Sequence, residues 1–203
     1  MLIHLQSAAP DASIAHFVQS FWMLENSLPK GHPEDPVHPA ADGANSKLRP
    51  YLTGIKPVYS NITMVEGVIH DAAVNVPHLW QFVKGGKIFA LGDERSLILG
   101  AKGDGSLSFA TGIKEPEGWP AACGIDFNSR DQVRDWFTNA LPGWSEAWLE
   151  LFASDDAYYI PRPMYHFPVD QHWPTLPNLT IIGDAAHRMP PYAGEGVNQA
   201  APP

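Results

Sequence analysis

The strongest chemical signal in the chain is the segment 179–200, LTIIGDAAHRMPPYAGEGVNQA. Its apolar start predicts a strand buried on both faces, and ligands of α/β sheets bind where such strands end. Gly183 would allow close backbone approach, and the carboxylate of Asp184 suits a sugar hydroxyl. Gly194 and Gly196 would free backbone amides at a helix start, where negative charge is favoured. A Gly-Asp dipeptide by itself would indicate only a strand-to-helix turn.

The full pattern GDAAHxxxPxxGxGxN resembles the GD motif of the class A FAD-dependent monooxygenases, the aromatic-ring-hydroxylase type. The resemblance implies that Asp184 holds the ribitol of FAD or the neighbouring phosphate. It also implies that Pro191 approaches the flavin ring. The turn that would face the pyrimidine edge of the flavin contains Gly194, Gly196, Val197 and Asn198.

A second segment, ADGANSKLR at residues 41–49, is similar to the DG motif of the same family through Asp42, Gly43, Ser46 and Arg49. In the family this motif lies near the FAD pyrophosphate and the path of the reduced nicotinamide cofactor. The resemblance therefore implies cofactor contacts here, with Ser46 capping the helix that carries Arg49. Without the resemblance, the segment would be only a turn.

The stretch before this motif departs from the family. Residues 29–39, PKGHPEDPVHP, contain four prolines, which exclude a helix interior and a central strand. The family has an apolar strand at this place. We therefore expect a linker where the family has a strand.

The resemblance extends over residues 40–200 and is closest to the tetracycline-inactivating branch, through LTGIKPVYSNITMVEG, ATGIKEPEGW and YIPRPMYHFPVDQHW. Substrate-contacting positions of that branch fall on Glu66, Lys87 and Ser108. The residue types at Lys87 and Ser108 differ from those that bind the drug. We therefore expect a small aromatic or polycyclic substrate other than tetracycline.

The family chemistry implied is hydroxylation with FAD as cofactor, NAD(P)H as co-substrate and O2 as the oxygen source. Such enzymes open with G-x-G-x-x-G in a βαβ unit of about 30 residues, and we do not find this motif. Gly100, Gly103 and Gly105 have hairpin spacing instead. We expect a fragment that is inactive as an isolated chain. Two alternatives stay open: a fusion fragment that needs a partner, and a small-molecule-sensing regulator, because AHFVQSFWMLENS resembles AraC-type regulators.

Composition and charge weigh against other classes. The chain is 44% hydrophobic and carries a net charge of −9, which argues for a globular protein without a nucleic-acid partner. One cysteine, Cys123, cannot form an internal disulfide, and no leader or bilayer-length apolar run is visible, so we expect a cytoplasmic protein. Neither a metal-ligand motif nor an activated nucleophile is visible, so we expect no metal and no catalytic side chain. The oligomeric state is left open.

Short apolar runs punctuated by turn residues predict an antiparallel meander: ITMVEGVI, LWQFV, KIFAL, SLILGA and SLSFATGI. The turns between the runs are Lys84-Gly85-Gly86, Gly92-Asp93-Glu94 and Gly103-Asp104-Gly105. They supply the residues that adopt positive φ in tight hairpins. The fold class we predict is α+β, a β-meander substrate domain with helices plus a remnant of a Rossmann-like FAD-binding domain.

Two helices are expected after the meander. One starts at Ser129 as N-cap, and the other spans residues 145–152. The first would place Val133, Trp136, Phe137 and Leu141 on one face. Near the N-terminus, residues 14–24 fit a helix or a strand equally well.

The domain division we predict has four stretches. They are an N-terminal segment with linker at 1–39, a DG-motif remnant at 40–60, a substrate-binding domain at 61–175 and the GD-motif strand and helix start at 176–203. Six aromatic residues could floor a substrate cavity, although simple core positions are the more common use of such residues. They are Trp80, Phe82, Phe89, Phe109, Tyr165 and Phe167.

Overall fold

The computed structural model describes residues 38–155 and 157–191, and these fall into two compact units. Unit 1 is the described part of Met1–Lys56 and Phe167–Pro203, and unit 2 is Pro57–His166. The expectations for residues 14–24, for the AraC-like phrase and for the turn that contains Gly194, Gly196, Val197 and Asn198 lie outside the described residues.

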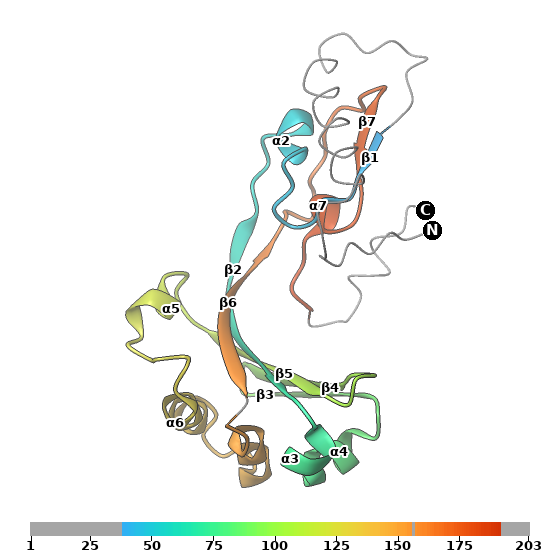
Figure 1. Cartoon of the computed structure of the whole chain (residues 1–203). Coiled ribbons are helices and arrows are strands. Elements are labelled where there is room, and N and C mark those ends of the chain that lie inside the picture. The colour runs from blue at the N-terminus through green and yellow to red at the C-terminus, as the bar shows by residue number, and fades with distance from the viewer. Residues whose placement is uncertain (1–37, 156, 192–203) are drawn as a thin grey trace. The chain divides into compact units, whose positions relative to one another are not determined.

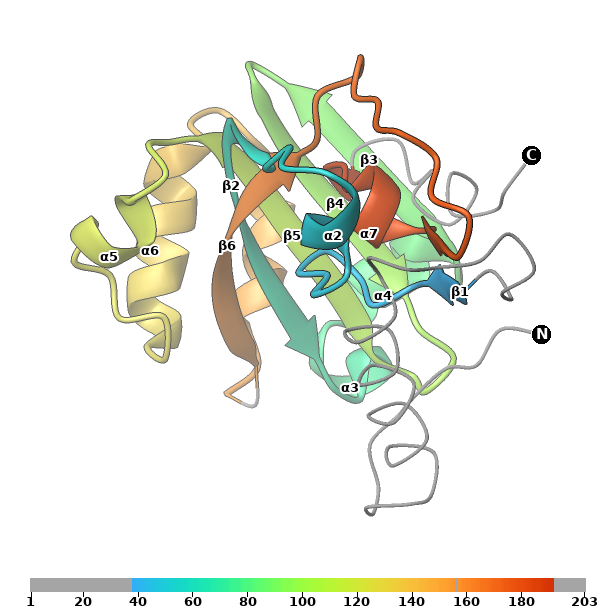
Figure 2. The same cartoon turned by 90° about the horizontal axis from the view of Figure 1, so that it is seen from above.

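Unit 2 is built on a five-stranded antiparallel sheet (Figure 1, Figure 2). Its strands are β2 (Val58–Ile69), β3 (Lys87–Gly92), β4 (Arg95–Ala101), β5 (Leu107–Lys114) and β6 (Tyr158–His166), in the order β3-β4-β5-β2-β6. Four of the five predicted runs form these strands, so the predicted mixture of helices and antiparallel sheet is confirmed. The β3–β4 connection has positive φ at Asp93 and Glu94, as a two-residue hairpin loop requires.

The strand predicted for LWQFV is wrong, because this run lies in helix α4 (Pro77–Val83). Pro77 occupies the first helical position, where its missing N–H costs nothing. Leu79 and Val83, one helical turn apart, are both buried. An apolar run this short cannot be assigned from periodicity, and Lys84 and Gly85 with positive φ end the helix rather than close a hairpin.

Helices cover one face of the sheet in unit 2 (Figure 1). Helix α6 (Arg130–Ala140) starts at Ser129, whose hydroxyl accepts from the amide of Gln132, as predicted. The predicted helix at 145–152 is a 3-10 helix, η1 (Glu146–Phe152). The shorter helices are α3 (Ala72–Asn75) and α5 (Trp119–Ala122). The core residues of the covered face include Val65, Ile69, Leu97, Leu99, Leu107, Phe109, Val133 and Phe137.

Strand β6 lies at one edge of this sheet although it contains Pro161 and Pro163. Their partners on β2 are Val65 and Thr63, two residues apart, so both prolines occupy the same kind of pair in the antiparallel pattern. At an edge, the nitrogen of such a residue can face away from the neighbouring strand, where no ladder hydrogen bond is lost. The prolines are therefore compatible with strand pairing.

Unit 1 contains a parallel pair of strands, β1 (His38–Ala40) and β7 (Leu179–Ile181), in which Pro39 pairs with Thr180. The expectation that the linker runs through residue 39 is therefore wrong at its end. The carbonyl of Ala40 accepts from the amide of Ile182, so the polar groups of Ala40 face β7 and the nitrogen of Pro39 faces away. Thr180 is exposed, which corrects the prediction that β7 is buried on both faces.

Two short helices complete the described part of unit 1: α2 (Arg49–Leu52) and α7 (Asp184–His187). A small apolar cluster joins them to the strands. Its buried members are Ala40, Leu48, Leu52, Leu179, Ile181, Ala185 and Ala186. Within the ranges that the structure describes, no helix has the length and apolarity that crossing a membrane requires.

Candidate functional site

The two motifs singled out in the sequence leave the same edge of the parallel pair in unit 1. Ala40 is paired with Ile181, and both strands run in the same direction. Asp42 and Gly183 each follow two residues after these paired positions. Because loops at the carboxyl ends of parallel strands meet at one edge, the Asp42 turn and the Gly183 turn lie at the same edge of the pair.

Gly183 and Asp184 form the turn from β7 into α7. Gly183 has φ 63° and ψ −147°, a conformation that favours glycine strongly over other residues. Asp184 is the first residue of α7 and is exposed, and no described residue donates a hydrogen bond to its carboxylate. The side chain is therefore available to accept from hydroxyl groups of a ligand.

The Asp42 turn presents a second carboxylate that can accept a further hydrogen bond. Oδ2 of Asp42 accepts from the amide of Lys47 at 2.7 Å, whereas Oδ1 is buried and has no partner among the described residues. A buried oxygen without a donor carries a desolvation cost that a ligand hydroxyl or a bound water would remove. Gly43 has φ 81°, and Ser46 accepts from the amides of Leu48 and Arg49 at 3.2 and 2.9 Å.

Arg49 lies inside unit 1, with 5% of its surface exposed. Its guanidinium donates to the carbonyls of Ile55 at 3.3 Å, Ala185 at 2.8 Å and Ala186 at 3.3 Å. It also donates to Oε1 of Gln171 at 2.6 Å. Burial lowers the pKa of Arg49 from its ordinary value, but an arginine stays charged in proteins. Arg49 was expected to contact the cofactor, whereas in the structure these donors bind protein groups.

Aromatic rings flank the same guanidinium. Its central carbon lies 3.5 Å from the ring centroid of Phe167 and 5.2 Å from that of Trp173. Neither Gln171 nor Trp173 was predicted as a site residue, and both stand more than 120 positions from Arg49. Their only sequence signal was the aromatic, proline-rich run that contains them. Pro191, predicted to approach a flavin ring, is exposed at the end of the described segment.

The three predicted substrate-contacting residues lie in unit 2, on the face of the sheet opposite the helices. Lys87 and Ser108 both pair with Gly100, so they stand in one row across three strands. Oγ of Ser108 donates to the carbonyl of Gly100 at 3.1 Å. Glu66 accepts from Nε of Arg162 on β6 at 2.5 Å. We call this side of the sheet the open face.

The six aromatic candidates do not share one cavity. Phe109 is a core residue that packs edge-on against Phe152. Phe167 lies in unit 1, where its ring stacks on the guanidinium of Arg49. Phe82 is 58% exposed and pairs with Trp148 on the helical side. Phe89 alternates with Ile88 and Ala90 of the core side, so it lies on the open face and is 43% exposed. Trp80 packs against the core, and Tyr165 donates to Glu117.

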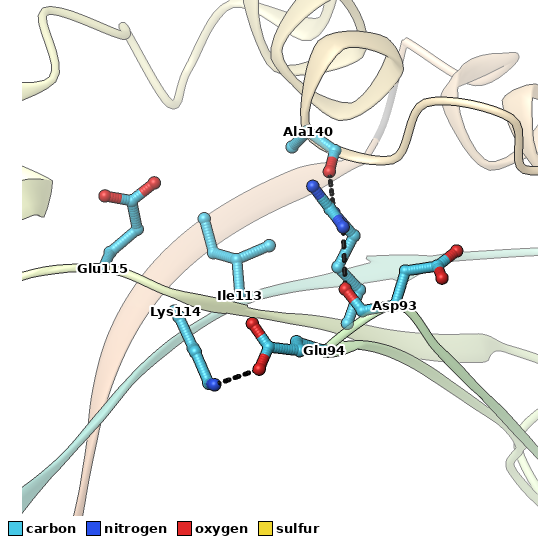
Figure 3. Close-up of a pocket in the computed structure, with 7 residues that line it drawn as sticks. Asp93, Glu94, Ile113, Lys114, Glu115 and Ala140 are labelled. Carbon is cyan, nitrogen blue, oxygen red and sulfur yellow. Dashed lines mark hydrogen bonds and ion pairs between the residues drawn. The ribbon is translucent and has the colours of Figure 1, made fainter.

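A hollow of about 260 Å³ lies elsewhere in unit 2, near the β3–β4 turn (Figure 3). Three of its charged side chains are engaged: Lys114 donates to Glu94 at 2.6 Å, and Arg95 donates to the carbonyls of Ala140 and Asp93. None of the predicted site residues lines it. Among the residues with described positions, no group of three His, Cys, Asp or Glu side chains is arranged to hold a metal.

Comparison with known sequences identifies relatives over most of the chain. The family described as FAD binding domain matches residues 40–202. A 3-amino-4-hydroxybenzoate 2-monooxygenase of Streptomyces platensis is 30% identical over 162 residues, which are 79% of this chain and 38% of the relative. A chloroplastic zeaxanthin epoxidase of Nicotiana plumbaginifolia is 27% identical over 77% of this chain and 22% of its own length. The chain thus spans well under half the length of these relatives.

Solved structures share the fold of this chain. HpxO of Klebsiella pneumoniae, complexed with FAD and uric acid, matches with a TM-score of 0.58 and 20% identity over 81% of this chain and 39% of that chain. A salicylate hydroxylase substrate complex matches with a TM-score of 0.57 and 19% identity over 91% and 54% of the two chains. At these identities the likeness establishes the fold.

Proposed function

The chain belongs to the FAD binding domain family, and from this premise we propose that it is part of an FAD-dependent monooxygenase that hydroxylates a small aromatic or polycyclic molecule. In this proposal the stretches 40–60 and 176–203 contact the flavin cofactor. The stretch 61–175 carries the substrate face. NAD(P)H is the proposed reductant and O2 the proposed oxygen source.

The observation that carries the proposal is the common edge from which the Asp42 and Asp184 turns emerge. One turn has a buried carboxylate oxygen without a donor, and the other has an exposed carboxylate without one among the described residues. A polyol chain such as ribitol, with several adjacent hydroxyls, has the donors that both carboxylates require. The residues present therefore fit the cofactor that defines the family.

FAD, when bound, supplies the redox chemistry, taking electrons from a nicotinamide nucleotide and delivering one oxygen atom of O2 to the substrate. The protein side chains are then required to bind, to orient and to exclude water. Asp42 and Asp184 would accept from cofactor hydroxyls, and Gly183 would let the main chain approach closely. We place Pro191 near the flavin ring.

The open face of unit 2 is the proposed substrate side, because the helices cover the other face. It combines an exposed aromatic ring, Phe89, with the polar residues Glu66, Lys87 and Ser108. Such a mixture suits a planar molecule with a few polar substituents. The two relatives named above act on a substituted benzoate and on zeaxanthin, and the mixed face favours the first kind of substrate.

The test is a titration of the chain with FAD, followed by absorbance and fluorescence of the flavin. We expect saturable binding, weakened about tenfold to a hundredfold in Asp184→Asn, because a hydrogen bond to a charged acceptor is lost. Asp170→Asn is the matched control, since Asp170 is an exposed carboxylate of the same unit outside both motifs. Equal FAD affinity in the Asp184 and Asp170 variants would contradict the assigned role.

A further inference from the structure

The guanidinium of Arg49 is committed to protein groups. An arginine has five N–H donors, and four hydrogen bonds are made here, to Ile55, Ala185, Ala186 and Gln171. The side chain is nearly fully buried and stacked on the face of Phe167. An anchor for a cofactor phosphate needs several free donors turned toward the ligand, and Arg49 does not have them.

Its acceptors on α7 are the carbonyls that a helix end leaves unpaired. Ala185 and Ala186 belong to a helix of four residues, whose carbonyls have no partner further along the helix. A cation at this end is also favoured by the helix dipole. The main chain just after Asp184 is therefore held from the segment that contains Asp42.

Gln171 joins Arg49 and Ala186 in a closed ring of hydrogen bonds. Its Oε1 accepts from Arg49, and its Nε2 donates to the carbonyl of Ala186 at 2.8 Å. The amide of Phe167 donates to the carbonyl of Arg188 at 3.1 Å, two residues further along. The segment between Asp184 and Pro190 is thus fixed at three of its carbonyls, those of Ala185, Ala186 and Arg188.

We propose that Arg49 is a positioning residue, which together with Gln171 locks the main chain after Asp184 to the Asp42 turn, so that both carboxylates face one ligand. This inference rests on the proposed function for the identity of that ligand, FAD. Lysine cannot replace Arg49, because an ammonium has no planar face for Phe167 and no fork that spans separate carbonyls.

The experiment compares Arg49→Lys, Gln171→Leu and the double variant in the full chain, with Arg134→Lys, an exposed arginine of α6, as control. Hydrogen exchange of residues 183–191 is measured by mass spectrometry before any FAD is added, and FAD affinity is measured at two salt concentrations. We expect faster exchange in this segment for both single variants and no change in the control.

For FAD affinity we expect a loss of about tenfold or more in each single variant, with the salt dependence unchanged and the double variant little worse than Arg49→Lys. Unchanged exchange and affinity in Arg49→Lys would overturn the proposal. So would a loss confined to Arg49 variants with a reduced salt dependence, the result expected of a phosphate contact. If Arg49→Lys does not fold, Gln171→Leu, changed at a partly exposed residue, decides by the same measurements.

The two proposals fail separately. If the unaltered chain binds no FAD, the proposed function fails for this chain, and the exchange measurement alone decides the role of Arg49. Faster exchange in both variants would then support the lock, and wild-type exchange would overturn it.

Discussion

Unit 1 and unit 2 are each stabilised internally by a different kind of interaction. Unit 2 packs helices on one face of an antiparallel sheet around large apolar side chains such as Leu97, Leu99 and Phe109. Unit 1, in its described part, pairs two strands of three residues and places a buried, hydrogen-bonded guanidinium beside a cluster that includes three alanines. Apolar burial stabilises without demanding one geometry, whereas the contacts of Arg49 require one arrangement of specific carbonyls.

This contrast fits a division of labour. A substrate face needs a rigid platform that tolerates changes at its surface, and a sheet backed by helices provides one. A cofactor turn needs a main chain fixed at particular atoms, and hydrogen bonds to successive carbonyls provide that.

Among the substitutions that test this contrast between the units, Leu99→Ala is expected to have the largest effect on stability. Leu99 is fully buried between β3 and β5, and its truncation should lower the free energy of unfolding of unit 2 by about 2–5 kcal/mol. Denaturant unfolding followed by circular dichroism measures the loss. Phe89→Ala, on the open face of the neighbouring strand, is the control and should cost much less. Equal losses would show that the covered face does not dominate the stability of this unit.

A smaller loss of stability is expected from Glu150→Ala, which removes a polar contact in unit 2. Glu150 of η1 accepts from the amides of His78 and Leu79, at 3.1 and 2.9 Å, and so caps the start of α4 from a distant part of the chain. Glu150→Ala should cost about 0.5–2 kcal/mol, the usual range for a lost helix cap. Glu146→Ala, at an exposed position of the same 3-10 helix, is the control. A loss as large as that of Leu99→Ala would break the contrast between the units.

The smallest effect is expected from the exposed ion pair of the hollow. The hydrogen bond and the charge of Lys114 lower the pKa of Glu94, so its contribution to stability is present above the unfolded pKa, about 4.3, and lost as pH falls through the folded value. Glu94→Gln should therefore change stability little at pH 7 and flatten its decline in acid. Thermal unfolding between pH 3 and 7, at low and high salt, checks this. Lys114→Gln should remove the same acid dependence, and persistence of the dependence in both variants would argue against the pair.

Local patterns predicted the elements whose signals are close together in sequence. Ser129 and the apolar residues that follow it at helical spacing were enough to predict α6. The hairpin at Asp93-Glu94 was predicted from its turn residues. The run that contains Leu79 and Val83 was misassigned because a short apolar run fits a helix or a strand. Pro39 was assigned to a linker because proline does not fit a central strand, and the sequence does not show that this residue lies in an edge position.

The candidate site was predictable in part for the same reason. The DG and GD motifs are local, so Asp42 and Asp184 could be named from the sequence alone. The contacts of Arg49 with Ala185 and Ala186 join residues 136 and 137 positions apart through main-chain carbonyls, which every residue has. No side-chain pattern marks such an acceptor, and only the fold shows it.

The two prolines of β6 have a consequence for how the protein behaves in concentrated solution. An edge strand offers unpaired N–H groups that another chain can use to extend the sheet, which is a common start of aggregation. Pro161 and Pro163 remove two such donors from the outer side of β6. β6 can thus form the edge of the sheet while pairing less readily with the β6 strand of a second molecule.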